Sequence, residues 1–257
     1  MNRKIVFFDI DGTILNEKKQ IPASAKQAIT KLQENGAYVA IATGRAPFMF
    51  ETIRKELGIE SYVSYNGQYV VFEGEVVYNN PLGQEELTKL YQQSSENNFP
   101  MVFMTEDHMW ASVADHPYIT ESFGSLKFNY PKVNPNLKND NKIYQALLFC
   151  EKESEEKIAA QHNSFRFVRW HDLSCDVLPG GGSKAVGVEK LIEASGLNIT
   201  DSFAFGDGLN DMEMIEEVGT GIAMGNAVSE LKSIADYVTD DVGNDGILKG
   251  LKHLKLI

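Results

Sequence analysis

Short runs of apolar residues alternate with stretches of helical periodicity at the start of the chain. Ile5 to Phe8 and Tyr38 to Ala42 are almost wholly apolar, which is typical of strands buried on both faces of a parallel sheet. Between them, apolar side chains three and four positions apart predict a helix that begins near Pro22 and ends at Gly36. Another helix is expected from Pro47 to Leu57. The pattern therefore predicts strand–helix–strand units.

The same alternation returns in the last third of the chain. It predicts helices over 183–195 and 209–217, strands over 202–205 and 221–224, and a final helix, strand and helix. Strands that alternate with helices of this length form right-handed crossovers and a doubly wound parallel sheet. We therefore expect the two ends of the sequence to share one α/β domain with a Rossmann-like sheet.

The middle of the chain has a different pattern. Short strand-like runs over 62–64, 69–72 and 76–78 indicate antiparallel hairpins. They are followed by predicted helices over 84–97 and 154–161, strands over 101–104, 109–113, 143–150, 165–170 and 174–178, and a polar loop over 127–141. We interpret residues 82–181 as an inserted α+β domain, and residues 1–81 with 182–257 as the domain that contains the parallel sheet.

Composition and charge limit the classes of function. The 257 residues are 43% hydrophobic and 23% charged, as in ordinary folded proteins. A net charge of −12 argues against nucleic acid or an anionic membrane as a partner, and no obligate protein partner is inferred. No apolar stretch approaches the roughly 20 residues of a membrane span, and no signal peptide is evident, so a cytoplasmic protein is expected. Cys150 and Cys175 match no metal or redox motif.

Polar residues gather where three of the predicted strands end. Asp9-Ile10-Asp11-Gly12-Thr13 follows the first strand, Thr43-Gly44-Arg45 follows the second, and Gly206 to Asp211 follows the strand over 202–205. In an open parallel sheet, ligands bind at the carboxyl ends of the strands. We therefore expect these three segments to form one site.

The carboxylates in these segments indicate a divalent cation. Asp9 and Asp11 are two residues apart, so their side chains point to the same side of an extended chain. Asp207 and Asp211 add two more carboxylates. Oxygen donors of this kind suit Mg²⁺, and the sequence has no His or Cys cluster that favours zinc. Lys184, which begins a predicted helix after a glycine-rich stretch, is expected to reach the same edge as a point charge.

These residue types indicate the chemistry of phosphoryl transfer. A cation beside exposed backbone amides, with the Thr43 hydroxyl and one lysine, is an arrangement that binds a phosphoryl group. Asp9 is then the expected nucleophile, because the chain offers no better activated group beside the metal. Asp11 is the expected acid and base, which protonates the leaving oxygen and later deprotonates the attacking water.

The same residues resemble the four motifs of the haloacid dehalogenase (HAD) superfamily. Asp9 to Thr13, then Thr43, then Lys184, then Gly206 to Asp211 match these motifs in order. The position of the insert, between the second and third motifs, resembles the Cof-type branch with a type IIB cap. The resemblance covers the whole chain and implies a HAD phosphatase core, an inserted α+β cap domain and Mg²⁺ as the cofactor.

The resemblance also implies a role for each matching residue. Asp9 would be nucleophile and metal ligand, and Asp11 would be acid and base with its backbone carbonyl on the metal. Asp207 would complete the metal ligands, and Asp211 would support them. The phosphoryl group would be contacted by Thr43, Gly44, Lys184, Asn210 and the amide of Ile10.

Other polar residues are further candidates for substrate contacts. Arg45 is expected either to contact substrate or to pair with a carboxylate, and Asn66 either to hold a turn or to contact a ligand. In the insert, His108, Arg169 and His171 are candidates for recognising the leaving group.

These observations predict a Mg²⁺-dependent phosphatase that acts on small phosphorylated metabolites, such as sugar phosphates or phosphorylated cofactors, through an aspartyl phosphate. Two alternatives stay open. A phosphomutase would return the phosphoryl group to the sugar, and a receiver-like signalling domain would accept phosphate from a partner protein. The inserted cap argues against the receiver, which needs an exposed aspartate.

Overall fold

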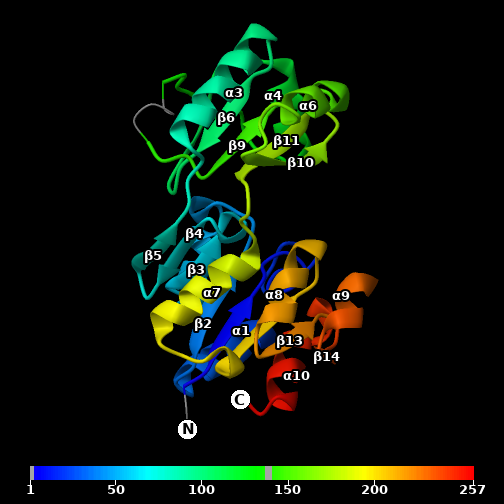
Figure 1. Ribbon diagram of the computed structural model, residues 1–257. Coiled ribbons are helices and arrows are strands. Elements are labelled where there is room, and N and C mark those ends of the chain that lie inside the picture. The colour runs from blue at the N-terminus through cyan, green and yellow to red at the C-terminus, as the bar shows by residue number, and fades with distance from the viewer. Residues whose placement is uncertain (1–2, 137–140) are drawn as a thin grey trace. The chain divides into compact units, whose positions relative to one another are not determined.

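The chain divides into two compact units, and the computed structural model describes its residues 3–136 and 141–257 (Figure 1). Unit 1 comprises Met1–Arg45, Met49–Asn79 and Ser183–Ile257. Unit 2 comprises Ala46–Phe48 and Asn80–Gly182. Each unit has its own sheet, and the two are described separately below.

The sheet of unit 1 runs in the order β14-β13-β12-β1-β2-β3-β4-β5. Its strands are β1 (Ile5–Phe8), β2 (Tyr38–Ala42), β3 (Ser61–Ser64), β4 (Tyr69–Phe72), β5 (Glu75–Asn79), β12 (Ser202–Gly206), β13 (Thr220–Ala223) and β14 (Tyr237–Val238). Neighbouring strands from β14 to β3 are parallel, and β4 and β5 extend the sheet in antiparallel fashion. The predicted doubly wound α/β fold is confirmed.

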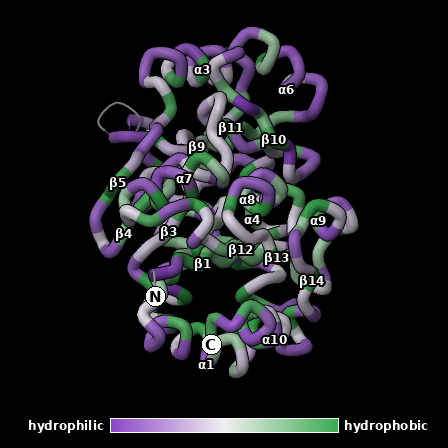
Figure 2. Tube along the Cα trace, turned by 60° about the horizontal axis from the view of Figure 1, so that its bottom comes forward, coloured by the Kyte–Doolittle hydropathy of each residue, from purple (hydrophilic) through white to green (hydrophobic). Residues whose placement is uncertain are grey.

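Helices cover both faces of this sheet, so that the central strand β1 is completely buried. α1 (Ala23–Glu34) and α10 (Gly246–His253) lie on one side of β1, β12 and β13, and α7 (Lys184–Ser195) and α8 (Met212–Glu217) lie on the other (Figure 2). The remaining helices of unit 1 are α2 (Glu51–Leu57) and α9 (Ser229–Ile234), with the one-turn helices η2 (Tyr65–Gly67), η3 (Ile199–Asp201), η4 (Leu209–Asp211) and η5 (Val242–Asn244). None of the helices in the described part of the chain is long and apolar enough to span a membrane.

Two predicted helices are divided in the structure. The helix predicted over 47–57 consists of the one-turn helix η1 (Pro47–Met49) and α2, because Phe50 between them is completely buried and has non-helical backbone angles. The helix predicted over 209–217 begins as η4 before α8 continues it. In both cases a separate one-turn helix precedes the regular helix.

The antiparallel hairpin predicted at 62–64 is only partly correct. β3 pairs in parallel with β2 on one side and antiparallel with β4 on the other. A short run of apolar residues does not distinguish these two kinds of neighbour. β3 is therefore the last parallel strand of the sheet, and β4 and β5 form the hairpin at its edge.

Unit 2 contains a second sheet, in the order β10-β11-β9-β6-β7-β8. Its elements in chain order are α3 (Gln84–Glu96), β6 (Met101–Met104), β7 (Met109–Ala111), α4 (Pro117–Ser125), β8 (Lys132–Val133), β9 (Gln145–Leu148), α6 (Lys152–Ala159), β10 (Phe165–His171) and β11 (Ser174–Pro179). These strands pair antiparallel except β7 with β8. One face of the sheet forms a hydrophobic core with Leu87 and Leu90 of α3 and Ile158 of α6.

Two parts of unit 2 differ from what the sequence pattern indicates. The pattern gives no helix at 117–125, where α4 begins with Pro117 and is capped by the His116 side chain. The loop predicted over 127–141 contains β8, which forms because Lys132 and Val133 pair with β7. Residues 137–140 of that loop lie outside the described residues.

The turn after β3 is a place where one added methyl group should destabilise unit 1. Gly67 has φ of +97°, and a Cβ there would lie 2.0 Å from the backbone oxygen of Ser183. We expect Gly67→Ala to lower the free energy of unfolding by about 2 kcal/mol or more, because the backbone conformation and the contact both oppose a side chain. Urea denaturation measures the loss.

The matched control for this variant is Gly74→Ala. Gly74 has φ of +86°, but a Cβ there would have nothing within 4 Å. Only the backbone strain then applies, so a loss of about 1 kcal/mol is expected. If both variants lost the same amount, the close contact at Gly67 would not be a source of destabilisation.

Candidate active site

The carboxyl ends of β1 and β12 bring three aspartates together. Asp9 follows β1 directly, and its backbone N–H donates to the Phe205 oxygen at 3.0 Å, so the pairing of β1 with β12 continues into the site. Asp207 follows β12, and Asp211 lies one helical turn further on. One carboxylate oxygen from each of the three lies within 4.8 Å of the others. The strand-end clustering predicted from the sequence is therefore present for these residues.

Lys184 links two of these carboxylates. It is the first residue of α7 and is 1% exposed. Its Nζ lies 2.5 Å from Asp9 Oδ1 and 2.6 Å from Asp211 Oδ1. Although burial alone would lower the pKa of Lys184, the charges of Asp9 and Asp211 raise it, so the lysine stays charged. A buried cation thus lies between the end of β1 and the loop after β12.

Asp211 also organises the loop after β12. Its Oδ2 accepts hydrogen bonds from the backbone N–H groups of Asp207, at 3.0 Å, and Gly208, at 2.9 Å. Its other oxygen accepts from Lys184. Both oxygens of this completely buried carboxylate are therefore engaged within the protein.

Unlike an ordinary exposed aspartate, Asp9 and Asp207 both have raised pKa values. Burial raises the pKa of Asp9 to about 7, and the neighbouring charges of Asp211 and Asp207 add to this against the opposing effect of Lys184. Burial and the charge of Asp211 raise the pKa of Asp207 to about 6. Because their pKa values are raised, these two neighbouring carboxyl groups lose their protons less readily than usual, and a bound cation would stabilise both of them as carboxylates.

This donor set fits Mg²⁺. Asp9 and Asp207 offer carboxylate oxygens, which a hard divalent cation prefers, and these oxygens lie within 4.8 Å of each other. Asp207 is also held in place, because Thr13 Oγ1 donates to it at 3.4 Å. Its carboxylate lies directly against the Gly12 backbone, where there is no space for a side chain at position 12. A Cβ at Gly12, which has φ of +80°, would lie 2.0 Å from Asp207 Oδ2.

Asp11 is held away from this group by two cations. Arg45 donates to both of its oxygens, from Nε at 2.9 Å and from Nη2 at 2.7 Å, and Lys19 Nζ lies 2.7 Å from Oδ1. Although burial alone would raise the pKa of Asp11, the hydrogen bonds from Arg45 and Lys19 hold it below its usual value. Of the two roles expected for Arg45, the structure contains the pairing with a carboxylate.

The segment after β2 holds Thr43 by several hydrogen bonds. The Thr43 hydroxyl is nearly buried and accepts from the Arg45 backbone N–H at 3.2 Å, and the Thr43 carbonyl accepts from the Asn66 N–H at 3.1 Å. Gly44 faces the Asn66 amide, where a Cβ would lie 3.0 Å from it, and Asn66 Oδ1 is buried without a hydrogen-bond partner in the described structure. Asn210 is exposed in η4, and the Ile10 side chain is fully buried.

Asn226 is a site residue that the sequence reasoning missed. Its Nδ2 donates to the Gly12 carbonyl at 2.8 Å and to Asp207 Oδ2 at 3.4 Å, and its Oδ1 accepts from the Val242 N–H at 2.8 Å. It follows β13, the next parallel strand, at the edge where ligands bind. That position is the signal that could have indicated it.

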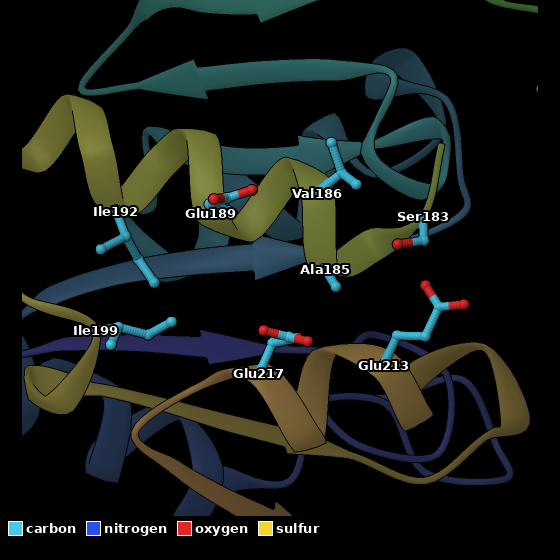
Figure 3. Close-up of a pocket in the computed structure, with 8 residues that line it drawn as sticks. All are labelled: Ser183, Ala185, Val186, Glu189, Ile192, Ile199, Glu213 and Glu217. Atoms are coloured by element: carbon cyan, nitrogen blue, oxygen red, sulfur yellow. The ribbon is translucent and has the colours of Figure 1, made fainter. Parts of the chain in front are cut away.

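A cavity of about 710 Å³ in unit 1 contains part of the site. Asp11, Asp207 and Asn226 line it, and its other charged lining residues are Glu17, Lys18, Lys19 and Asp241. A separate groove of about 310 Å³ lies between α7 and α8 (Figure 3). Glu189, Glu213 and Glu217 are among its lining residues, and none of the three clustered aspartates lines it. We therefore place the chemistry at the strand ends.

The three candidates in the insert lie in unit 2 and have partners there. Arg169 donates to the backbone oxygens of His171, Asp172 and Cys150 and forms an ion pair with Glu155. The His171 ring contacts Ser122 Oγ at 3.2 Å. His108 is exposed beside Asp107, at 2.8 Å. The structure does not bring these side chains together.

The strand ends of this doubly wound sheet carry a buried aspartate–lysine pair and a set of carboxylates that could hold a metal. This combination is typical of α/β enzymes that bind phosphoryl groups. The family model for haloacid dehalogenase-like hydrolases matches residues 6–251. The chain belongs to this family, and it is an enzyme of the HAD phosphatase type.

Individual relatives agree with this assignment. The chain is 53% identical over 257 residues, 100% of both chains, to "Putative phosphatase YkrA" of Bacillus subtilis (strain 168). The crystal structure of a hypothetical protein from Geobacillus kaustophilus HTA426 has 57% identity and a TM-score of 0.98 over 100% of both chains. A sugar phosphatase of HAD subclass IIB has 29% identity and a TM-score of 0.81, covering 99% of this chain and 100% of its own. The predicted resemblance to the type IIB branch is confirmed.

The raised pKa values predict how Mg²⁺ and pH act together on stability. A carboxyl whose pKa is higher in the folded protein than in the unfolded chain stabilises the fold at low pH, and this contribution is lost as the pH rises to the folded value. For Asp9 that loss extends from an ordinary 3.8 to about 7. Because Mg²⁺ binds carboxylates only when they are deprotonated, we expect it to raise the melting temperature more at about pH 8 than at about pH 5.5.

Two variants make this measurement specific to the site. Asp207→Asn should abolish the rise in melting temperature at both pH values. Asp201→Asn should retain it, because Asp201 is a buried aspartate that pairs with Lys4 instead. An equal rise at both pH values would argue against metal binding by these carboxylates.

Removal of the Lys184 charge should destabilise the protein. In Lys184→Met, Asp9 and Asp211 stay buried without their counter-charge, and we expect the metal-free protein to lose about 3 kcal/mol of unfolding free energy. The double variant Lys184→Met with Asp211→Asn should regain part of this loss, because one buried charge is gone. Chemical denaturation with a chelator present measures both, and an unchanged stability of the single variant would contradict the assigned pairing.

Proposed function

We propose that the protein is a Mg²⁺-dependent phosphomonoester hydrolase that acts on small phosphorylated metabolites through an aspartyl phosphate. The observation that carries the proposal is the buried Asp9–Lys184–Asp211 arrangement beside Asp207. Phosphoryl transfer depends on positioning and on positive charge around the transferred group. This arrangement offers a nucleophilic carboxylate, a fixed cation and ligands for a second cation in one place.

Asp9 acts as the nucleophile in the first step. One of its oxygens forms a bond to phosphorus while the bond from phosphorus to the leaving oxygen breaks, and Asp11 gives its proton to that oxygen. In the second step a water molecule attacks the phosphorus and loses a proton to Asp11. The bond between Asp9 and phosphorus then breaks, which releases inorganic phosphate and restores the carboxylate.

The contacts of Asp11 suit the second step. Arg45 and Lys19 hold it as a carboxylate, which is the form that takes a proton from the attacking water. For the first step Asp11 must carry a proton and turn away from Arg45. Arg45 therefore acts on the reaction through Asp11 as a positioning residue.

The remaining site residues bind the phosphoryl group. We assign this role to Thr43, Gly44, Lys184, Asn210 and the backbone amide of Ile10. The Thr43 backbone is tied to β3, because its N–H donates to the Val63 oxygen at 2.8 Å. A hydroxyl held this firmly can orient a phosphoryl oxygen with little loss of entropy on binding.

Mg²⁺ would be held by the carboxylates of Asp9 and Asp207 and by the backbone carbonyl of Asp11. When bound, it supplies neutralisation of the charge on the phosphoryl oxygens. Asp211 positions this set through Lys184 and through the amides after β12, and Asn226 fixes Asp207 against Gly12.

The substrate in this proposal is a small phosphate ester, and no protein partner is needed for turnover. The relative in subclass IIB named as a sugar phosphatase supports a sugar phosphate, and phosphorylated cofactors remain in the proposed class. Residues 1–81 and 182–257 form the phosphatase core, and residues 82–181 form the cap that recognises the leaving group.

The decisive assay is release of inorganic phosphate from 4-nitrophenyl phosphate. We expect Asp9→Asn to lower kcat by about 1,000-fold or more, because the variant keeps the shape of the side chain and lacks the nucleophilic oxygen charge. Chelation of Mg²⁺ should abolish the activity of the unmodified protein. Asp201→Asn, the buried aspartate paired with Lys4, is the control and should keep the activity.

Other results would favour other functions. Activity that survives Asp9→Asn would remove the aspartyl phosphate from the mechanism. Isomerisation of a hexose phosphate without release of phosphate would indicate a phosphomutase. A stable phosphoprotein that forms only with a partner kinase would indicate a receiver.

A further inference from the structure

The turn that follows β3 has an unusual backbone. Tyr65, Asn66 and Gly67 have φ values of +52°, +50° and +97°, so three consecutive residues lie in the left-handed region. Glycine adopts this region freely and asparagine tolerates it, whereas a bulky residue adopts it only where the surrounding structure imposes it. Among the described residues, Tyr65 is the one aromatic residue with this conformation, and its side chain is completely buried. Such strain is often found where a site needs a fixed geometry.

One side of the turn holds the segment after β2. The Tyr65 N–H donates to the Arg45 carbonyl at 3.2 Å. The Asn66 N–H donates to the Thr43 carbonyl at 3.1 Å, so the two bonds hold the carbonyls on both sides of Gly44. The Asn66 amide lies against Gly44 itself, where a Cβ would be 3.0 Å from its Oδ1 and Nδ2. The turn therefore sets the position of this segment.

The other side of the turn lies against the start of α7. A Cβ at Gly67 would be 2.0 Å from the Ser183 carbonyl oxygen and 3.2 Å from the Gly187 nitrogen. A Cβ at Gly187 would in turn be 2.7 Å from Gly67 Cα, so no side chain separates the two backbones. The Gly187 N–H donates to the Ser183 carbonyl at 3.3 Å, which closes the helical turn that contains Lys184.

The turn thus contacts two segments that bind the phosphoryl group in the proposed function. One segment carries Thr43 and Gly44, and the other carries Lys184. Both sets of contacts involve backbone atoms of the turn. A change of backbone conformation at Asn66 would therefore move Thr43 relative to Lys184. A displacement of about 1 Å in such a site can lower the rate about 100-fold.

We propose that the left-handed turn Tyr65–Gly67 sets the spacing between the Thr43 hydroxyl and the Lys184 ammonium group, and that Asn66 is a positioning residue for phosphoryl transfer. Asn66 acts through the segment that carries Thr43 and not by contact with the substrate. Of the two roles expected for Asn66, this is the holding of a turn. The inference rests on the phosphatase activity proposed above and adds a positioning residue to its site.

The test separates the backbone conformation of Asn66 from its amide. Asn66→Gly removes the amide and leaves the left-handed region accessible. Asn66→Val also removes the amide, but its β-branched side chain strongly opposes that region. With 4-nitrophenyl phosphate as the probe, we expect Asn66→Val to lower kcat/KM about 10- to 100-fold and Asn66→Gly to stay within about threefold of the unmodified protein.

Inhibition by orthovanadate measures the geometry of the phosphoryl site. Vanadate adopts the five-coordinate geometry of a phosphoryl group during transfer, so its binding reports contacts that are strongest in the transition state. We expect Asn66→Val to raise the inhibition constant of vanadate by the same factor by which it lowers kcat/KM. The inhibition constant of inorganic phosphate should rise less, and Asn66→Gly should change both constants little.

Asn98→Val is the matched control. Asn98 has φ of +57° and is exposed in unit 2, so the same substitution opposes the same backbone conformation in the other unit. It should lower the melting temperature and leave kcat/KM and the inhibition by vanadate unchanged. Circular dichroism before each assay gives the folded fraction, so that a loss of folded protein is not counted as a loss of positioning.

Each contrary result has a distinct meaning. If Asn66→Gly loses as much activity as Asn66→Val, the amide matters and the backbone does not, so the inference fails while the proposed phosphatase stands. If Asn66→Val only lowers the melting temperature, or lowers kcat/KM without weakening vanadate inhibition, the turn has a structural role alone and the inference again fails. If the unmodified protein releases no phosphate from the aryl ester, the proposed function itself fails, and the inference falls with it.

Discussion

The buried ammonium group of Lys184 is the interaction on which the site depends. It joins Asp9 after β1 to Asp211 after β12, while its own backbone begins α7. Loss of the lysine would leave two carboxyl groups buried without their counter-charge, which is far more costly than loss of an exposed ion pair. The same interaction therefore holds three separate segments in position and keeps a cation where a phosphoryl group would bind.

The position of Lys184 in the chain couples the site to the insertion. Asp9 and Lys184 are 175 residues apart, and the chain leaves unit 2 at Gly182, two residues before the lysine. The pair can form only after the chain has passed through unit 2 and returned, so it is a contact of high loop-closure entropy. Lys184 is the first residue of α7. The fold of unit 1 therefore tolerates an insertion just before it, because the insertion interrupts no helix or strand.

The clustering of polar residues at the strand ends was predictable because these residues follow the ends of elements that the hydrophobic pattern already indicates. Asp9, Thr43 and Asp207 each come directly after a buried strand, and parallel strands end at one edge. The hydrophobic pattern does not predict which side chains form hydrogen bonds with one another. The pairing of Arg45 with Asp11, and the reach of Asn226 to Gly12 and Asp207, depend on side-chain directions that spacing does not contain. The division of the helix predicted over 47–57 has a related reason, because Phe50 is buried in the core and has non-helical backbone angles, which the periodicity does not show.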